Sequence, residues 1–383
     1  MDGIIGFLNK RKEAGLLRIL RPVLSYRQGR ICRDKTEYID FSSNDYLGLR
    51  DHPRMKEESK KAIDEFGTSS SASRLLSGDL KLHHDLEDRI AAFKNKEAAL
   101  VFNSGYQANT GIISALYSKK DCIFSDRLNH ASIIDGIILS GAQFFRFKHN
   151  DPQHLESLLR NNRCNFKNAL IVSESIFSMD GDRAPLGELV RLKEKYACRL
   201  MVDEAHATGI FGERGSGVIE EEGLEEEVDL VMGTFGKALG GFGAYLAASK
   251  KIVDYLINTC RSFIYSTALP AAVIAADITA LDLVKNESFR REKLLSLSRY
   301  FRESLREKGF QVKGNSQIVP LILEDTYKAV SFAEYLQEKG YWVLPIRPPT
   351  VPLKEARLRF SLTFYHSKEI LEKLINELCE IKI

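Results

Sequence analysis

The chain has 383 residues, of which 44% are hydrophobic and 28% are charged, as in an ordinary globular protein of about two to three domains. Its 55 basic and 52 acidic residues leave a net charge of +3, and the basic residues form no run that would indicate nucleic-acid binding. No apolar segment approaches the roughly 20 residues that cross a membrane. The six cysteines are far apart and form no C-x-x-C pair, so we expect no metal site and a cytoplasmic location.

Residues 1–20 mix apolar and basic side chains without the hydrophobic region of a signal peptide, and they predict an amphipathic helix. Farther along, short apolar segments alternate with helical patterns at 107–117, 131–140 and 186–196. This alternation predicts an α/β fold, with a mostly parallel seven-stranded sheet that has helices on both faces. The predicted strands are Ala98–Phe102, Cys122–Ser125, Gln143–Phe147, Ala169–Ser173, Leu200–Asp203, Leu230–Gly233 and Ala244–Ala248.

The pattern changes after about Pro270. Two long helical stretches lead into shorter alternating segments, at 271–284, 291–308, 318–323, 341–344 and 357–362. We therefore expect an N-terminal helix and segment at 1–48, a large cofactor-binding domain at 49–270 and a smaller α+β domain at 271–383.

Polar or glycine-rich sequence follows four of the predicted strands. The carboxyl ends of parallel strands meet at one edge of a sheet, and ligands bind beyond that edge. A functional site is therefore predicted from Asn103–Tyr106, Glu174–Ser178, Asp203–His206 and Thr234–Lys237.

The motif Val202-Asp203-Glu204-Ala205-His206 ends an apolar strand in an acid, with a histidine three residues later. One interpretation is a carboxylate buried beneath a cationic ring nitrogen, where each charge stabilises the other. A second is the Asp-Glu-Ala-His box of a helicase, which requires a phosphate loop of the form G-x-x-x-x-G-K-[ST]. That loop is missing, because Gly236-Lys237 is followed by Ala238 and Val231 occupies the position of the first glycine. A third is an acid that only caps a helix.

A lysine follows the next strand, in Gly233-Thr234-Phe235-Gly236-Lys237-Ala238. Small neighbours leave room for a planar cofactor, and a partly buried lysine amine can form a Schiff base. Thr234 is placed to bond a phosphate, although a surface loop lysine would also fit this pattern. Two more segments, Asn103–Asn109 and Asn129–Ser132, offer a helix start for a phosphate and an imidazole for a cofactor face. Alone, each is typical of ordinary structure, but together they supply the groups that a pyridoxal 5'-phosphate (PLP) site needs.

These segments resemble the fold-type I PLP enzymes and, among them, the α-oxoamine synthases. The resemblance covers nearly the whole chain and includes Phe41–Leu49, Phe177–Asp182, Val202–His206, the Lys237 segment and Ile264–Thr267. It implies a catalytic set of Lys237, His130 and Asp203, in which Lys237 forms the Schiff base, Asp203 pairs with the pyridine nitrogen and His130 stacks on the ring. The other residues implied to bind the cofactor are Gly105, Tyr106, Ser178, His206, Thr234, Ser266 and Thr267, the last two reaching the cofactor of the partner subunit in a homodimer.

The same resemblance implies an acyltransferase that condenses an amino acid with an acyl-CoA or acyl-carrier-protein thioester and releases CO₂. The stretches Ile346–Pro352 and Ala356–Arg359 most resemble the branch that joins L-alanine to a pimeloyl thioester in biotin biosynthesis. Arg359 would bind the amino-acid carboxylate, and Arg18, Asn44 and Thr350 would lie on the substrate side. The alternatives are a glycine and acetyl-CoA enzyme of the same family, a PLP aminotransferase and a non-catalytic subunit.

One stretch departs from the family pattern Gly-Thr-Gly-Ser-x-Gly-Ser-Arg. Residues 67–74 read Gly-Thr-Ser-Ser-Ser-Ala-Ser-Arg, so Ser69 and Ala72 replace two glycines. If these positions need a positive φ, the replacements strain the backbone there.

Overall fold

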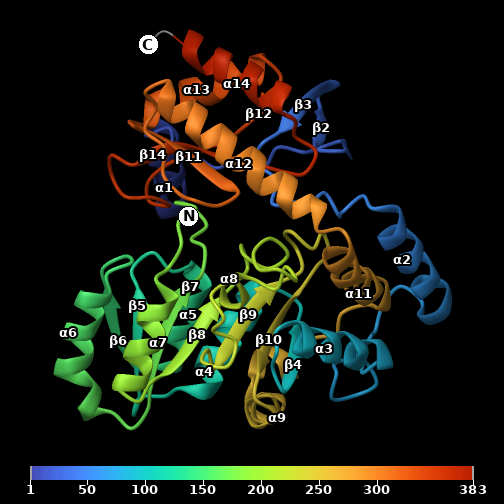
Figure 1. Cartoon of the computed structure of the whole chain (residues 1–383), viewed down its shortest axis with the longest axis vertical. Coiled ribbons are helices and arrows are strands. Elements are labelled where there is room, and N and C mark those ends of the chain that lie inside the picture. Colours follow the sequence, from blue (N-terminus) through green and yellow to red (C-terminus); the bar gives the residue numbers. More distant parts are fainter. Residues whose placement is uncertain (1, 382–383) are drawn as a thin grey trace. The chain divides into compact units, whose positions relative to one another are not determined.

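The computed structural model describes residues 2–381, which separate into two compact units (Figure 1). The large unit comprises residues 44–178 and 182–293, and the small unit comprises residues 2–43, 179–181 and 294–381. The N-terminal segment thus belongs with the C-terminal residues. The helix after Pro270 belongs to the large unit, because it packs against two helices of that unit. The domain boundaries predicted at residues 48 and 270 stay a prediction from the sequence pattern.

A seven-stranded sheet forms the centre of the large unit, in the order β4-β10-β9-β8-β7-β5-β6. β10 runs antiparallel to both of its neighbours, and the other neighbouring pairs are parallel, so the predicted mostly parallel sheet is confirmed. Its strands are β4 (Ala98–Phe102), β5 (Cys122–Asp126), β6 (Gln143–Phe147), β7 (Ala169–Glu174), β8 (Arg199–Asp203), β9 (Leu230–Thr234) and β10 (Ala244–Ala248).

Helices cover both faces of this sheet. The core on one face joins strand residues such as Leu100, Val172 and Met232 to apolar side chains of α4, α5 and α9. α3 and α7 pack on the opposite face, which explains why these strands are apolar on both sides. The helices of the large unit are α2 (Pro53–Phe66), α3 (Lys81–Phe93), α4 (Gly105–Leu116), α5 (Ala131–Ser140), α6 (Pro152–Asn162), α7 (Leu186–Lys195), α8 (Val218–Glu221), α9 (Lys250–Thr259), α10 (Arg261–Ile264) and α11 (Ala271–Asn286), with a 3₁₀ turn η1 at Arg163–Asn165.

The small unit is an α+β structure with two sheets, as the sequence predicts. One has the order β1-β2-β3-β12 and the other β11-β14-β13. In β14 the side chains of Leu358 and Phe360 enter the core, where Phe360 packs against Phe41 and Phe301. The alternate residues Arg357, Arg359 and Ser361 share the other face. The elements are β1 (Ser25–Arg27), β2 (Arg30–Arg33), β3 (Thr36–Asp40), β11 (Ile318–Glu324), β12 (Tyr341–Trp342), β13 (Pro345–Ile346), β14 (Ala356–Ser361), α1 (Asp2–Glu13), α13 (Thr326–Glu338), α14 (Lys368–Glu380) and α12 (Phe289–Glu307), which begins in the large unit.

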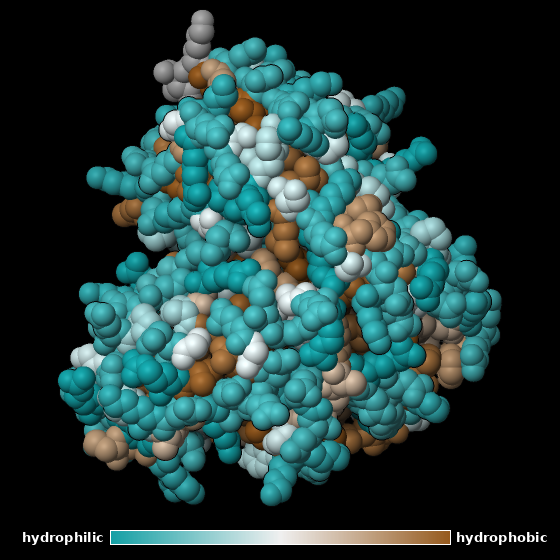
Figure 2. All heavy atoms as spheres, in the orientation of Figure 1, coloured by the Kyte–Doolittle hydropathy of each residue, from teal (hydrophilic) through white to brown (hydrophobic). Residues whose placement is uncertain are grey.

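The predicted N-terminal helix is shorter than expected, because α1 ends at Glu13 and Gly15 then takes a φ of +62°. Met1, which the prediction included, lies outside the described residues. Among residues 2–381, no helix has both the length and the apolar character to cross a membrane. Most of the face drawn in Figure 2 is hydrophilic, with smaller hydrophobic areas between the polar side chains.

Candidate functional site

Asp203 ends β8 at the carboxyl edge of the sheet, and only 5% of it is exposed. Its Oδ1 accepts a hydrogen bond from the Ala205 amide at 2.9 Å, and its Oδ2 accepts one from Asn109 Nδ2 at 2.9 Å. These two hydrogen bonds hold the buried carboxylate in one orientation. Asp203 is therefore suited to face a cationic ring nitrogen, as the sequence predicts.

His130 precedes α5 and caps the helix, since its Nδ1 accepts from the Ser132 amide at 3.2 Å. The His130 amide donates to Glu174 Oε1 at 2.7 Å, which ties the start of α5 to the end of β7. His130 is exposed to solvent, although the partial burial of its ring lowers the pKa of the imidazole. The neutral ring thus retains an open face, as a stacking role requires.

Lys237 follows β9 and is half-buried. Its charge acts on both His130 and Glu174, which places the lysine in one electrostatic cluster with Asp203. Burial, followed by repulsion from Asp203, raises the pKa of Glu174 to about 8, and the charge of Lys237 opposes that rise. The structure thus brings the predicted lysine, acid and imidazole together and adds Glu174, which lies in a predicted site segment but had no predicted role of its own.

A cradle for an anion lies where β9 approaches the start of α4. A Cβ built on Gly105 would lie 2.8 Å from Thr234 Cγ2, so only glycine permits this approach. Thr234 Oγ1 is buried and has no hydrogen-bond partner within residues 2–381. An unpartnered hydroxyl beside a helix N-terminus fits a phosphate group.

His206 lies three residues after Asp203 and is also buried. Its Nδ1 lies 2.8 Å from Tyr46 Oη, and Tyr46 Oη donates to Asn44 Oδ1 at 3.0 Å. The predicted substrate residue Asn44 is therefore linked through Tyr46 to a predicted cofactor residue. Ser178, which follows β7, is partly buried in the same unit.

Ser266 and Thr267 lie beside the start of α4 in the same chain. Gln107 Nε2 donates to Ser266 Oγ at 2.7 Å, and Asn103 Nδ2 donates to the Thr267 carbonyl at 2.8 Å. The nearby Tyr106 ring meets the His130 ring edge to face, with centroids 6.5 Å apart. All three residues thus adjoin elements that carry the predicted cofactor set.

The stretch that departs from the family pattern is not strained at its two replacements. Within residues 67–74 the positive φ angles belong to Gly67 and Ser71. Ser69 and Ala72 do not need a positive φ, so the condition under which the two replacements would strain the backbone is not met. Ser73 forms an isolated antiparallel bridge with Thr267, and the Ala72 carbonyl accepts from the Ala268 amide at 2.9 Å.

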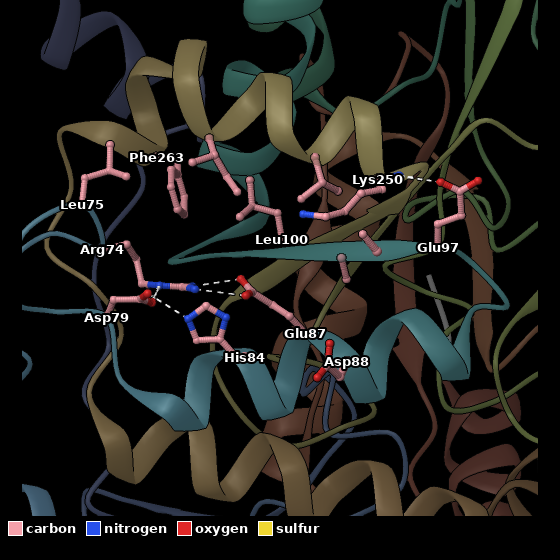
Figure 3. Close-up of a pocket in the computed structure, with 14 residues that line it drawn as sticks. Arg74, Leu75, Asp79, His84, Glu87, Asp88, Glu97, Leu100, Lys250 and Phe263 are labelled. Carbon is pink, nitrogen blue, oxygen red and sulfur yellow. Dashed lines mark hydrogen bonds and ion pairs between the residues drawn. The ribbon is translucent and has the colours of Figure 1, made fainter.

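Arg74, at the end of this stretch, lines a cavity of about 280 Å³ in the large unit (Figure 3). Its guanidinium donates to both carboxylate oxygens of Glu87, at 2.9 and 3.0 Å, and also to Asp79. Glu87 also accepts from the Val101 amide at 3.0 Å. Because Arg74, Glu87 and Asp79 bond one another, these three side chains serve the local structure of the cavity wall.

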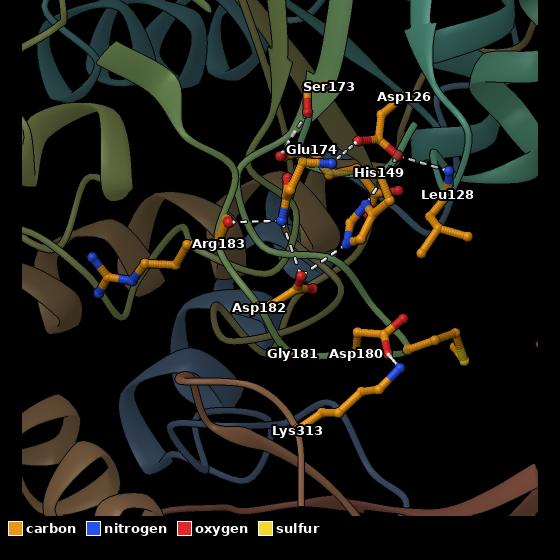
Figure 4. A network of polar contacts seen from close by, with 12 residues as sticks. Asp126, Leu128, His149, Ser173, Glu174, Asp180, Gly181, Asp182, Arg183 and Lys313 are labelled. Carbon is orange, nitrogen blue, oxygen red and sulfur yellow. Dashed lines mark hydrogen bonds and ion pairs between the residues drawn. The ribbon is translucent and has the colours of Figure 1, made fainter. Parts of the chain in front are cut away.

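A second network surrounds His149 at the ends of β5 and β6 (Figure 4). Its Nδ1 lies 3.0 Å from Asp126 Oδ1, and its Nε2 lies 2.8 Å from Asp182 Oδ2. Burial alone would lower the pKa of His149, but the hydrogen bonds to the two carboxylates raise it to about 9. His149 is therefore a structural cation that fastens the segment after Gly181.

In the small unit, the structure distinguishes the two arginines of β14. Arg357 is fully buried and donates to Asp180 Oδ1 at 2.7 Å and to Glu355 Oε2 at 2.6 Å. Arg359 donates to Ser361 Oγ at 2.5 Å. The carboxylate partners of Arg357 indicate a structural role for Arg357, and the substrate role of Arg359 stays a prediction from the sequence.

Two other predicted substrate residues meet in the small unit, where Arg18 Nη2 donates to Thr350 Oγ1 at 3.3 Å. Arg347 lies nearby and donates to the Gly15 carbonyl. Burial, followed by repulsion from Arg18 and Arg21, lowers the pKa of Arg347. The guanidiniums of Arg18, Arg21 and Arg347 are therefore close enough to repel one another.

The residues of the large unit fit PLP. Asp203 fits the ring nitrogen, Lys237 the aldehyde and Thr234 the phosphate. The fold and this site define a fold-type I PLP-dependent transferase. A family model for aminotransferase class I and II matches residues 36–378, and the chain belongs to that family.

Its relatives indicate a narrower group. The 8-amino-7-oxononanoate synthase of Geotalea daltonii is 48% identical over 98% of this chain and 96% of its own, and that of Geobacter sulfurreducens is 49% identical over 99% and 97%. Among solved structures, the serine palmitoyltransferase of Sphingomonas wittichii superposes with a TM-score of 0.92 at 34% identity, over 98% of this chain and 95% of its own. The 8-amino-7-oxononanoate synthase of Francisella tularensis superposes with a TM-score of 0.78 at 31% identity, over 90% and 97%.

Proposed function

We propose that this protein catalyses the decarboxylating condensation of L-alanine with a pimeloyl thioester, giving 8-amino-7-oxononanoate, CO₂ and the free thiol. The relatives that are 48–49% identical over nearly the whole chain support the reaction. The structural observation that carries the choice of acyl group is the cluster of Arg18, Arg21 and Arg347. A pimeloyl group ends in a carboxylate, and guanidiniums bind carboxylates with directed, charge-assisted hydrogen bonds.

Bound PLP supplies an electron-accepting ring that stabilises negative charge at the alanine α-carbon. Lys237 anchors the cofactor, and its released amine then removes the α-proton of alanine and returns a proton at the end. Asp203 keeps a proton on the ring nitrogen, because its buried carboxylate favours a cation. Arg359 binds the alanine carboxylate, which is the group that leaves as CO₂. His206 and Ser178 bind the phenolic oxygen of the cofactor.

We further propose that the working unit is a homodimer in which Ser266 and Thr267 reach the partner subunit's cofactor. Large apolar side chains are exposed near these two residues: Tyr265, which directly precedes Ser266, is 72% exposed, and Leu76, three residues after the Ser73 that bridges to Thr267, is 78% exposed. Such side chains typically mark a surface that another protein covers. Light scattering of the purified protein should give twice the chain mass of 43.3 kDa. The cytoplasmic location predicted from the cysteine spacing also remains a proposal.

The direct test is thiol release by the PLP-loaded protein, with pimeloyl-CoA or acetyl-CoA and either alanine or glycine. We expect release that requires alanine and pimeloyl-CoA, together with equimolar CO₂. Release only with glycine and acetyl-CoA would contradict the proposed substrates while retaining the condensation. Transfer of the amino group to a keto acid, without release of thiol or CO₂, would replace condensation with transamination.

A further inference from the structure

Asn109 joins two residues that the proposed function uses separately. It lies on α4 and is 99% buried, since only 1% of it is exposed. Its Nδ2 donates to Asp203 Oδ2 at 2.9 Å and to Ser132 Oγ at 3.0 Å. Ser132 Oγ lies 2.8 Å from His130 Nδ1. A continuous chain of hydrogen bonds therefore runs from the acid to the imidazole.

The close contact of α4 and α5 makes this chain possible. Gly136 of α5 faces α4, and a Cβ built on it would lie 2.9 Å from the Asn109 carbonyl oxygen. A larger residue would push α5 away and separate Ser132 from Asn109. The close packing of α4 and α5 therefore sets the distance between Asn109 Nδ2 and Ser132 Oγ.

The orientation of the Asn109 amide follows from its neighbours. If the amide were turned over, its oxygen would face the oxygen of the Asp203 carboxylate, and two acceptors would repel each other. With Nδ2 toward Asp203, both amide hydrogens are used, although Asn109 Oδ1 has no partner within residues 2–381. Both amide hydrogens of Asn109 therefore form hydrogen bonds to groups of the site, and its oxygen forms none within residues 2–381.

The direction of the hydrogens also determines the His130 tautomer. The Ser132 amide can only donate, and it points at His130 Nδ1, so Nδ1 carries a lone pair. Ser132 Oγ accepts from Asn109 and is left to donate its own hydrogen to the same nitrogen. The neutral ring therefore carries its hydrogen on Nε2.

We propose that Asn109 is a positioning residue that couples Asp203 to His130. One amide hydrogen orients the Asp203 carboxylate toward the cofactor ring nitrogen, and the other acts through Ser132 to fix the Nε2–H tautomer of His130. The inference rests on the proposed function, because the ring nitrogen belongs to PLP. Asn109 is the branch point and Ser132 lies on only one arm, so loss of the Ser132 hydroxyl breaks the His130 arm and leaves the Asp203 arm.

The test compares Asn109→Ala, Ser132→Ala and a control, Asn168→Ala, in the PLP-loaded protein. Asn168 Nδ2 donates to Asp121 Oδ1 at 2.7 Å, before the start of β7, so its loss removes a comparable bond away from the site. Nitrogen-15 NMR of labelled PLP reports the protonation of the ring nitrogen. Nitrogen-15 NMR of labelled histidine reports the His130 tautomer, with the signal identified by its loss in His130→Asn.

In Asn109→Ala we expect the pH at which the ring nitrogen loses its proton to fall by about one unit, because the Asp203 carboxylate loses the hydrogen bond that fixes its orientation toward that nitrogen. The Ser132→Ala protein should keep the wild-type ring-nitrogen titration. In both variants the His130 signals should move only partway from those of the Nε2–H tautomer towards those of a mixture, because the Ser132 amide remains as a donor to Nδ1. The Asn168→Ala protein should match wild type in both measurements.

The inference is overturned if Asn109→Ala keeps the wild-type ring-nitrogen titration, or if the His130 signals of Ser132→Ala are the same as those of wild type. Asn109→Leu fills the same space without a donor and replaces the alanine variant if that variant does not fold. Failure of the wild-type protein to bind PLP is a separate result, which contradicts the proposed function itself.

Discussion

Lys94 Nζ lies 2.8 Å from Glu204 Oε2, and both side chains are buried in the large unit. Lys94 also donates to Thr208 Oγ1 at 3.1 Å and to the Ser216 carbonyl. Burial alone would lower the pKa of Lys94, but the charge of Glu204 raises it, so the ammonium is retained. Glu204 directly follows Asp203. The Lys94–Glu204 ion pair therefore anchors the turn that carries Asp203.

Removal of one member of this pair should destabilise the protein strongly. The Lys94→Met variant leaves the Glu204 carboxylate buried without its cation, and we expect unfolding to become easier by about 3–5 kcal/mol. Adding Glu204→Gln should restore part of this loss, because the uncompensated charge is then gone. Urea unfolding measures both effects. Lys61→Met removes only exposed pairs with Glu57 and Glu58 and should leave the stability close to that of wild type.

Glu174 should make the cofactor-free protein less stable as the pH rises. Its pKa is about 8 in the folded chain against an ordinary value of 4.5, so the folded protein binds more protons between these pH values. The free energy of unfolding therefore falls from pH 5 to pH 8. Glu174→Gln retains an acceptor for the His130 amide and should gain on the order of 2 kcal/mol over wild type across this range. Parallel pH dependences of the two proteins would show that Glu174 does not titrate there.

His149 should have the opposite kind of pH dependence. Its pKa of about 9 exceeds the ordinary 6.5, so its pairing with Asp126 and Asp182 contributes fully below about pH 6.5 and is lost through pH 9. We expect the stability difference between wild type and His149→Gln to shrink by about 2 kcal/mol from pH 6 to pH 9, after an allowance for the partly exposed ring. Thermal unfolding at several pH values measures it. A difference that stays constant would argue against a charged His149.

Arg359 should control the affinity for the amino acid. Lysine keeps the charge but cannot form two parallel bonds to a carboxylate, so Arg359→Lys should raise KM for alanine by about 10- to 100-fold. Steady-state kinetics at saturating thioester measures the change, and PLP absorbance should remain that of wild type. Arg357→Lys should reduce stability instead, because Arg357 bonds Asp180 and Glu355. An unchanged KM in Arg359→Lys would reject its role.

Arg347 should select thioesters that end in a carboxylate. Pimeloyl-CoA and heptanoyl-CoA have acyl chains of equal length, but only the first ends in an anion. We expect Arg347→Ala to lower kcat/KM for pimeloyl-CoA by about 10- to 100-fold and to leave heptanoyl-CoA within about 2-fold. Equal losses with both thioesters would mean that Arg347 shapes the site without binding the terminal group.

Local sequence patterns were sufficient for the main features of the large unit. The predicted strands Ala98–Phe102, Gln143–Phe147 and Ala244–Ala248 match β4, β6 and β10 at both ends. A strand buried on both faces is apolar throughout, and that signal lies within about five neighbouring residues. Asp203 and Lys237 were recognisable for the same reason, since Asp203 ends such a strand and Lys237 lies three residues beyond another.

The partners of these residues could not be predicted, because they are distant in sequence. Asn109 looks like part of an ordinary helix start, and only the packing of α4 on α5 brings it to Asp203, 94 positions away. Glu174 acquires its raised pKa from burial and from neighbours on other strands. Short-range periodicity therefore determined the elements and the ends that carry the chemistry. The tertiary structure decided which buried polar groups pair, since each must find its donor or acceptor wherever the fold places one.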